Sequence, residues 1–541
     1  MHHHWIELVK WLAGALVWVA WLGAPPGGTS SMLSKDTVAR VLGPYVSPVV
    51  QETTDNHDER VLLIGFDGFT WRQIQPLIDG GHMPNFQRII ENGVALDLTA
   101  TGFPSSAASW PAIMTGCFPQ NTGIHSFFSL DPIRYELRLN HAQYRKRKAI
   151  WEYVSEKKLP SFVINVPISW PPDPIDGIMI AGLLSPDDGT FTHPEAISVP
   201  LREAGYVTGY RQFKQTMDFN GDAFTTGNVP MDVNTLFDIA LNRYQVVNYL
   251  MTKSDWRFGT AVFTLVDRFQ HNQTQLGSPM IHHACRQMDV LLGGMLRALP
   301  PRTTVVICSD HGFRRYDTTC MFPEWLRRNR FMETDGHGKP AWGTTRIIPL
   351  DRVGNCGVYR INVRGRDSRG TVDAVEIPAV IDAIRTAALK LTDGEGRKVV
   401  HEIIPLSGED GGPDLLVVLY PHLLMNHALD VSGEIVRELT SPVYDHEKEG
   451  IGVLYRPDRI RAGLRTTASV VDIAPTCLYL LGIPVPDDLD GRILTELVTD
   501  HGLIAYPIIR GGDSKRRSAE QKTVLQDEGV ISQLKSLGYI N

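Results

Sequence analysis

One segment of the chain, VLLIGFDG at residues 61–68, joins a continuous apolar run to an Asp-Gly pair. A run of this kind is typical of a strand that is buried on both faces of a parallel sheet. The same pattern occurs twice more, where TAVFTLV (260–266) leads into Asp267 and TVVICS (304–309) leads into Asp310. Ligands of open α/β sheets bind just beyond the carboxyl ends of the strands, so the three acids are predicted to line one crevice.

Histidines accompany these acids along the chain. His311 directly follows the third acid, and His271 lies four residues after the second, which is one turn if a helix begins there. A later histidine, His446, comes shortly before a fourth apolar run at residues 451–455. Three carboxylates in one crevice repel each other unless cations hold them. A mixed set of carboxylate and imidazole ligands suits Zn²⁺ or Mn²⁺ at a catalytic centre.

The composition sets the class of protein. The chain has 541 residues, of which 43% are hydrophobic and 21% charged, and these values exclude a disordered chain, a coiled coil or a collagen-like fibre. The formal net charge of −7 argues against a nucleic-acid polymer as the main partner, because such a partner requires a basic surface. The six cysteines include no Cys-x-x-Cys pair, so we interpret them as buried apolar residues rather than as disulfides or zinc ligands.

An apolar leader begins the chain. Residues 11–24 read WLAGALVWVAWLGA, which is shorter than the roughly 20 residues that span a bilayer but matches the core of a signal peptide. This segment predicts an exported protein, periplasmic or extracellular, or membrane association through residues 5–24. An interfacial or packed helix in a cytoplasmic protein is the alternative. We assign residues 1–59 as a whole to this leader and a linker.

A cluster of small hydroxyl residues lies between the first two predicted strands. Residues 101–116 read TGFPSSAASWPAIMTG, in which a Pro-led serine cluster precedes a more apolar segment that could be helical. A serine at the start of such a helix would face the crevice. The alternative for such a serine is a simple N-cap role, because caps select Ser strongly.

Together, these motifs resemble the alkaline phosphatase superfamily, and most closely its type I phosphodiesterase/nucleotide pyrophosphatase-like branch of bacterial phosphohydrolase or phosphomutase-like proteins. The motifs that carry the resemblance are, in chain order, Asp67-Gly68, Thr115-Gly116, Asp267-x-x-x-His271, Asp310-His311-Gly312 and His446. The likeness runs from about residue 60 to the end and includes LIDGGHMPNFQRIIENG (77–93), VINVPISWPP (163–172), GVYRINVRGRDSRG (357–370), SVVDIAPTCLYLLGIPVPDDLDG (469–491) and LKSLGY (534–539).

The resemblance implies an α/β fold, an alkaline phosphatase-like sandwich in which helices flank a central, mostly parallel sheet and a lobe is inserted. It also implies two divalent metal ions, with zinc expected and manganese as the alternative. One ion would be held by Asp67, Asp310, His311 and the oxygen of the nucleophile, and the other by Asp267, His271 and His446. The nucleophile of this superfamily stands nine residues before the Thr of the Thr-Gly pair, which is Ser106 here, with Ser105 and Ser109 as alternatives.

The implied activity is metal-dependent hydrolysis of a small phosphorylated substrate, by a phosphodiesterase or a phosphatase, through a phosphoseryl intermediate. A phosphotransferase or phosphomutase that uses the same intermediate is the alternative, and a non-catalytic homologue is a third reading. Sulfatases need a C/S-x-P-x-R setting, whereas Ala-Ala-Ser-Trp follows Ser106, so sulfate-ester hydrolysis is disfavoured.

One position departs from the relatives. Several of them carry, after a Gly-Ile pair, an Asn that contacts a phosphate oxygen. Here Gly123-Ile124 is followed by His125, and Phe127 takes the place of the Asn, which weakens the expectation of nucleotide diester specificity. His125 could replace the lost donor or could simply be packed.

The domain organisation follows from the placement of the motifs. We expect an α/β core at 60–312 with insertions at about 126–250, and an inserted lobe at 313–440 that helps to wall the site. Residues 441–499 would complete the core and carry the last metal ligand, and residues 500–541 would form a polar C-terminal tail.

Overall fold

The computed structural model describes residues 32–48, 59–186, 189–208, 233–272, 278–335, 341, 343–429 and 433–516. The predicted leader at 5–24, the motif at 534–539 and part of the predicted insertion at 126–250 lie outside these ranges. Among the described helices, none is both long and apolar enough to cross a lipid bilayer. Export or membrane association through residues 5–24 therefore stays a prediction.

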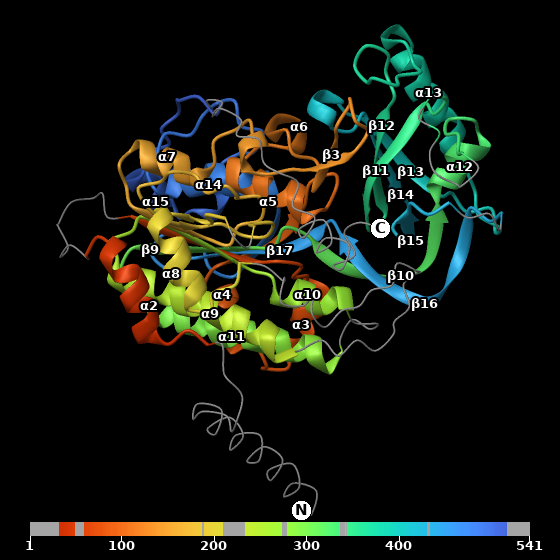
Figure 1. Ribbon diagram of the computed structural model, residues 1–541. Coiled ribbons are helices and arrows are strands. Elements are labelled where there is room, and N and C mark those ends of the chain that lie inside the picture. Colours follow the sequence, from red (N-terminus) through yellow and green to blue (C-terminus); the bar gives the residue numbers. More distant parts are fainter. Residues whose placement is uncertain are drawn as a thin grey trace, which may run out of the picture.

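A large sheet organises the described part of the chain (Figure 1). Within the described residues it has nine strands in the order β18-β2-β17-β9-β1-β8-β5-β6-β7. The strands are β1 (Arg60–Phe66), β2 (Val94–Thr99), β5 (Ser161–Ile164), β6 (Gly177–Ile180), β7 (Thr192–His193), β8 (Phe258–Phe263), β9 (Thr303–Cys308), β17 (Glu449–Tyr455) and β18 (Leu464–Ser469). Neighbours pair in parallel, except that β17 is antiparallel to both β9 and β2, and β7 is antiparallel to β6.

The three strands predicted from their apolar runs are β1, β8 and β9, and they are direct neighbours with β1 in the middle. Every residue of all three is buried, which explains why the runs show no polar alternation. The fourth predicted strand is β17. Because β17 runs antiparallel to β9, its amino end lies at the same edge of the sheet as the carboxyl end of β9.

Helices cover both faces of this sheet, and Figure 1 shows the two layers. Leu62 and Ile64 of β1 pack into one core, and their neighbours Val61 and Leu63 pack into the other, as expected when side chains alternate across a strand. The first core is covered by α2 (Lys35–Leu42), α3 (Trp71–Asp79), α4 (Pro84–Glu91), α9 (Val233–Lys253), α10 (Leu265–Asn272) and α11 (Pro279–Arg297). The second is covered by α5 (Ser106–Thr115), α7 (Ile150–Glu156) and α14 (Ile473–Leu480). These findings confirm the predicted fold class.

A lobe lies beside this body and has its own core (Figure 1). Its strands are β10 (Gly312–Met321), β11 (Ile347–Val353), β12 (Cys356–Ile361), β13 (Val400–Pro405), β14 (Leu415–Leu419), β15 (Leu423–Asn426) and β16 (Val436–Glu447), with helices α12 (Phe322–Arg328) and α13 (Ile377–Ala388). The long strands β10 and β16 pair antiparallel and lead from the body into the lobe and back. The remaining short elements are β3 (Phe128–Leu130), β4 (Leu137–Leu139), α6 (Pro119–Thr122), α8 (Ser198–Glu203) and α15 (Asp500–Ala505). The predicted domain boundaries stay predictions.

Two contacts join the lobe to the body near the predicted crevice. Phe103 of the serine loop (residues 101–105) packs in one apolar cluster with Ile348 and Val358 of the lobe sheet. Ser126 donates a hydrogen bond from its hydroxyl to Asp351 Oδ2 at 2.5 Å, and both residues are buried. The lobe is therefore anchored against the loop that precedes α5.

Asp351 is expected to give this contact a pH-dependent stability. Burial raises the pKa of its carboxyl from 3.8 to about 7, although the hydrogen bond from Ser126 acts to lower it. Because the folded-state pKa is the higher one, the stabilisation is complete below about pH 4 and is lost as the pH rises through 7. We expect the free energy of unfolding of Asp351→Asn, relative to the parent, to rise by on the order of 2–4 kcal/mol between pH 4 and pH 8.

Urea unfolding of both proteins across this pH range measures that difference. Asp317→Asn is the control, because it makes the same change at an exposed carboxylate of the same lobe, which pairs with Arg315 at the surface. An unfolding free energy that changes with pH in parallel for the parent and Asp351→Asn would contradict the expectation.

Candidate active site

The three predicted acids meet at the carboxyl edge of the sheet. Asp67 directly follows β1, Asp267 lies in the first turn of α10 after β8, and Asp310 lies two residues after the end of β9. Because β1 is flanked by β8 and β9, the ends of these strands bring the three side chains together. All three acids are buried.

The three predicted histidines lie among these acids. His311 Nε2 is 3.2 Å from Asp310 Oδ2 and 3.6 Å from Asp67 Oδ1. On the other side of the group, Asp267 Oδ1 is 3.4 Å from His271 Nε2 and 3.7 Å from His446 Nε2. The rings of His311 and His446 stack with their centres 3.5 Å apart. We call these six residues the carboxylate–imidazole cluster.

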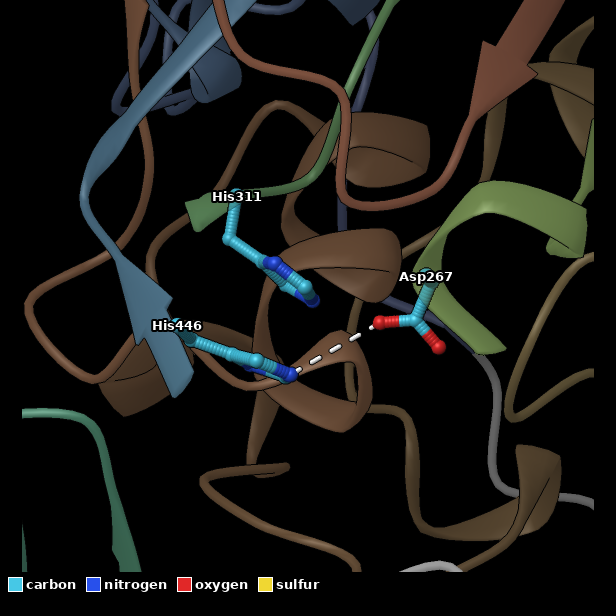
Figure 2. A group of neighbouring side chains, drawn as sticks. All are labelled: Asp267, His311 and His446. Carbon is cyan, nitrogen blue, oxygen red and sulfur yellow. Dashed lines mark ion pairs between the residues drawn. The ribbon is translucent and has the colours of Figure 1, made fainter. Parts of the chain in front are cut away.

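Two groups within the cluster have ligand atoms close enough together to hold a metal ion. Asp67, Asp310 and His311 form one group, in which these atoms all lie within 4.8 Å of one another. The other consists of Asp267, His311 and His446, and Figure 2 shows these three side chains pointing toward a common centre. His311 belongs to both groups, so the two candidate positions are adjacent.

The buried carboxylates have oxygens that no hydrogen-bond donor of the described residues satisfies. These oxygens are Asp67 Oδ1, both carboxylate oxygens of Asp267, and Asp310 Oδ2. A buried carboxylate oxygen without a donor costs free energy, and a metal ion is one of the few groups that can offset this cost. The donor set, which is made of carboxylates and imidazoles without thiolates, suits a divalent cation.

The electrostatics of the cluster also favour a bound cation. Burial, together with the charges of Asp310 and Asp267, raises the pKa of Asp67 well above its ordinary value. Burial and the charge of Asp267 likewise raise the pKa of Asp310 to about 8. Burial also acts to raise the pKa of Asp267, but His271 and Arg268 outweigh it, and the pKa lies below its ordinary value. Bound cations would relieve the repulsion among these three groups.

Two of the histidines, His311 and His446, are held in the neutral form that binds metals. Burial lowers the pKa of His311 to about 4, and burial with the charge of His311 lowers the pKa of His446 well below its ordinary value. His446 donates from Nδ1 to the Pro104 carbonyl at 2.8 Å, and His311 Nδ1 lies 3.2 Å from the Gly312 carbonyl. Such bonds fix the tautomer and turn Nε2 toward the cluster, where it lies 3.1 Å from the Ser106 hydroxyl in His311 and 3.0 Å from His271 Nε2 in His446.

The three candidate serines have different hydrogen-bond partners. Ser105 is the N-cap of α5, where its hydroxyl accepts from the Ala107 backbone amide. Ser106 is the first residue of the helix, and its hydroxyl lies 3.1 Å from His311 Nε2. Ser109 points elsewhere and pairs with the Thr101 hydroxyl at 3.3 Å. Ser106 is therefore the serine that the fold brings to the cluster.

The two residues considered after the Gly-Ile pair, His125 and Phe127, are both buried. Phe127 is fully buried in an apolar cluster with Ala107, beneath the start of α5. His125 is buried against Gly412, and burial lowers the pKa of its imidazole to about 4, so the ring is neutral at physiological pH. Phe127 thus supplies packing rather than a polar contact at this position.

Three groups at the cluster were missed by sequence reasoning. The Pro104 carbonyl holds His446, the Arg268 guanidinium lies 3.6 Å from Asp267 Oδ2, and the Trp110 indole donates to Asp67. Helical spacing could have found Trp110, which lies one turn after Ser106. A backbone carbonyl leaves no mark in a sequence, and a single Arg beside an Asp is too common to be a signal.

The sheet and its flanking helices define the α/β class of folds. Within it, the chain belongs to the type I phosphodiesterase/nucleotide pyrophosphatase family, whose sequence model matches residues 61–418. This membership places the chain among phosphoric ester hydrolases, in a family that uses divalent metals.

Three solved structures are similar to this chain at low sequence identity. Murine ectonucleotide pyrophosphatase/phosphodiesterase 5, in an inactive form in complex with AMP, is 14% identical over 82% of this chain and 100% of its own, with a TM-score of 0.50. A second murine structure (14% identity, TM-score 0.49) and the human protein (15% identity, TM-score 0.47) cover the same shares of both chains. A comparison with curated protein sequences gave no match.

Proposed function

We propose that this protein is a two-metal hydrolase of phosphoric esters in which Ser106 is the nucleophile. The observation that carries the proposal is a buried set of carboxylate oxygens without donors, placed around neutral imidazoles and beside the Ser106 hydroxyl. Family membership supports the reaction class. The substrate is proposed to be a small phosphorylated molecule, either a diester or a monoester.

The cluster divides into two proposed ligand sets. Asp67, Asp310 and His311, with the Ser106 hydroxyl, would hold one cation. A second set would consist of Asp267, His271 and His446. Zinc fits the carboxylate and imidazole donors best, and manganese is the alternative. When bound, the two cations supply charge neutralisation at the phosphoryl group and lower the pKa of a coordinated hydroxyl.

The proposed reaction has two steps, and both take place at Ser106. Ser106 attacks phosphorus in line, the bond from phosphorus to the leaving alcohol oxygen breaks, and a phosphoseryl intermediate forms. Water then attacks the same phosphorus and releases phosphate or a phosphomonoester from Ser106. Ser106 is the first residue of α5, where the positive end of the helix dipole favours the negative charge of a phosphoryl group. Phosphoryl transfer depends mainly on such positioning and on charge neutralisation.

A phosphotransferase or phosphomutase would use the same serine and pass the phosphoryl group to an alcohol. The two reactions differ in the acceptor, so product analysis with and without an added acceptor alcohol separates them. A non-catalytic homologue would bind the metals without turnover. The setting after Ser106, which is Ala-Ala-Ser-Trp, still disfavours a sulfatase.

Removal and return of metal tests the proposal. Treatment with a chelator is expected to lower turnover of an aryl phosphodiester or an aryl phosphomonoester by at least about 1000-fold, because the cations carry much of the barrier lowering. Reloading with Zn²⁺, and in a parallel sample with Mn²⁺, is expected to restore it. Comparing the two substrates on the reloaded protein assigns the ester preference. Full turnover by protein that elemental analysis shows to be metal-free would contradict the proposal.

A further inference from the structure

Trp110 makes a buried contact with the first acid of the cluster. Its indole Nε1 donates to Asp67 Oδ2 at 3.0 Å, and both side chains are buried. The other oxygen, Asp67 Oδ1, has no donor among the described residues and is the one that lies 3.6 Å from His311 Nε2. One oxygen of this carboxylate therefore accepts the hydrogen bond from the indole, and the other faces the cluster.

The same helix carries this indole and the proposed nucleophile. Ser106 and Trp110 are four residues apart in α5, so they lie on one face of the helix, one turn from each other. The indole lies against β1, where a Cβ added at Gly65 would collide with its ring. Gly65 lies in the last pleat of β1, two residues before Asp67, so the indole packs beside the strand end that carries this acid. The packing of α5 against β1 therefore fixes the positions of both the Ser106 and the Asp67 side chains.

We propose that Trp110 is a positioning residue that holds Asp67 as a one-oxygen metal ligand. The inference rests on the proposed function, because it takes Asp67 as a ligand. Without the indole N–H, the carboxylate can rotate or turn both oxygens toward the cation, and the ligand geometry around Ser106 is lost. Loss of a hydrogen bond that orients a metal ligand typically lowers metal affinity 10–100-fold.

The competing explanation is that Asp67 merely satisfies a buried indole N–H, since buried tryptophans usually find such a partner. The chain offers a matched case that is purely structural. Trp151 is equally buried and donates from Nε1 to Asp173 Oδ2 at 2.8 Å, but Asp173 is paired with Arg145 and Arg516, outside the cluster. Trp151→Phe therefore removes the same kind of bond without touching a proposed ligand.

The experiment compares wild type, Trp110→Phe and Trp151→Phe, each loaded with Zn²⁺ and dialysed against graded concentrations of a chelator. Elemental analysis measures the zinc retained at each step. Trp110→Phe is expected to release one of two zinc ions at a 10–100-fold lower chelator concentration than wild type, and to keep the other as wild type does. Trp151→Phe is expected to follow the wild-type profile, whatever its loss in melting temperature.

If Trp110→Phe and wild type retain zinc equally, within twofold, this inference is overturned and the proposed function is not. Wild-type protein that binds no zinc would overturn the proposed function and this inference together, so the two failures are distinguishable. If Trp110→Phe does not fold, wild-type protein labelled with ¹⁵N at the indoles of its 11 tryptophans replaces it. At least one indole N–H signal is expected to shift when Zn²⁺ is added, and an unchanged spectrum would overturn the inference.

Discussion

Ser106→Ala is expected to lower kcat/KM by about 10³–10⁶-fold, because loss of a nucleophile removes the covalent step and leaves only what positioning and charge provide. The fold and the metal content should stay close to those of the parent, since alanine is a good helix former and Asp67, Asp310 and His311 still hold the cation that the Ser106 hydroxyl would also contact. Steady-state kinetics on an aryl phosphoester, with elemental analysis of the same sample, measures both effects.

Ser109→Ala is the matched control for this experiment. It makes the same change on the same helix, but Ser109 pairs with Thr101 rather than with the cluster. Its kcat/KM is expected to stay within about tenfold of the parent, because it loses one neutral hydrogen bond. Full activity of Ser106→Ala would refute the assignment, and a collapse of activity in Ser109→Ala instead would move the nucleophile to that serine.

His446→Ala is expected to reduce the bound metal from two ions to one and to lower kcat/KM by at least about 100-fold, because one ligand set loses an imidazole. The remaining ion should stay with Asp67, Asp310 and His311, which the substitution leaves intact. Elemental analysis after gel filtration reports the stoichiometry directly.

His427→Ala provides the comparison. His427 is a histidine of the lobe whose Nε2 lies 3.1 Å from the Tyr359 hydroxyl and which belongs to neither candidate metal group. Its replacement should leave both ions in place. An unchanged ratio of two ions in His446→Ala would remove His446 from the proposed site.

The central strands and their acids could be predicted from the sequence for a local reason. A strand buried on both faces is predominantly apolar, so β1, β8 and β9 are visible as runs, and the first acidic residue after each run marks the end that faces the crevice. Asp67 shows this most simply, since it follows the last residue of β1 directly. The chain order of the motifs then carried the resemblance to the superfamily, which family membership confirms.

Other parts of the site depend on contacts that no local pattern reports. Which of Ser105 and Ser106 caps α5 is decided by backbone geometry, because either residue satisfies the preference of an N-cap. The partner of His446 is a carbonyl more than 300 residues earlier in the chain. The pairing of β10 with β16 likewise joins segments more than 100 residues apart, and a sequence gives no register for such a pair.

The place of β17 in the central sheet has a consequence for synthesis. This strand, Glu449–Tyr455, lies between β2 and β9, so β2 has no hydrogen-bonded route to β1 until β17 has been added. A nascent chain that ends before residue 449 would leave the edges of β2 and β9 unpaired, and such edges invite association with other chains. Productive folding on the ribosome is therefore expected to wait until β17 has been synthesised, and fragments that end before it should aggregate rather than accumulate as soluble intermediates.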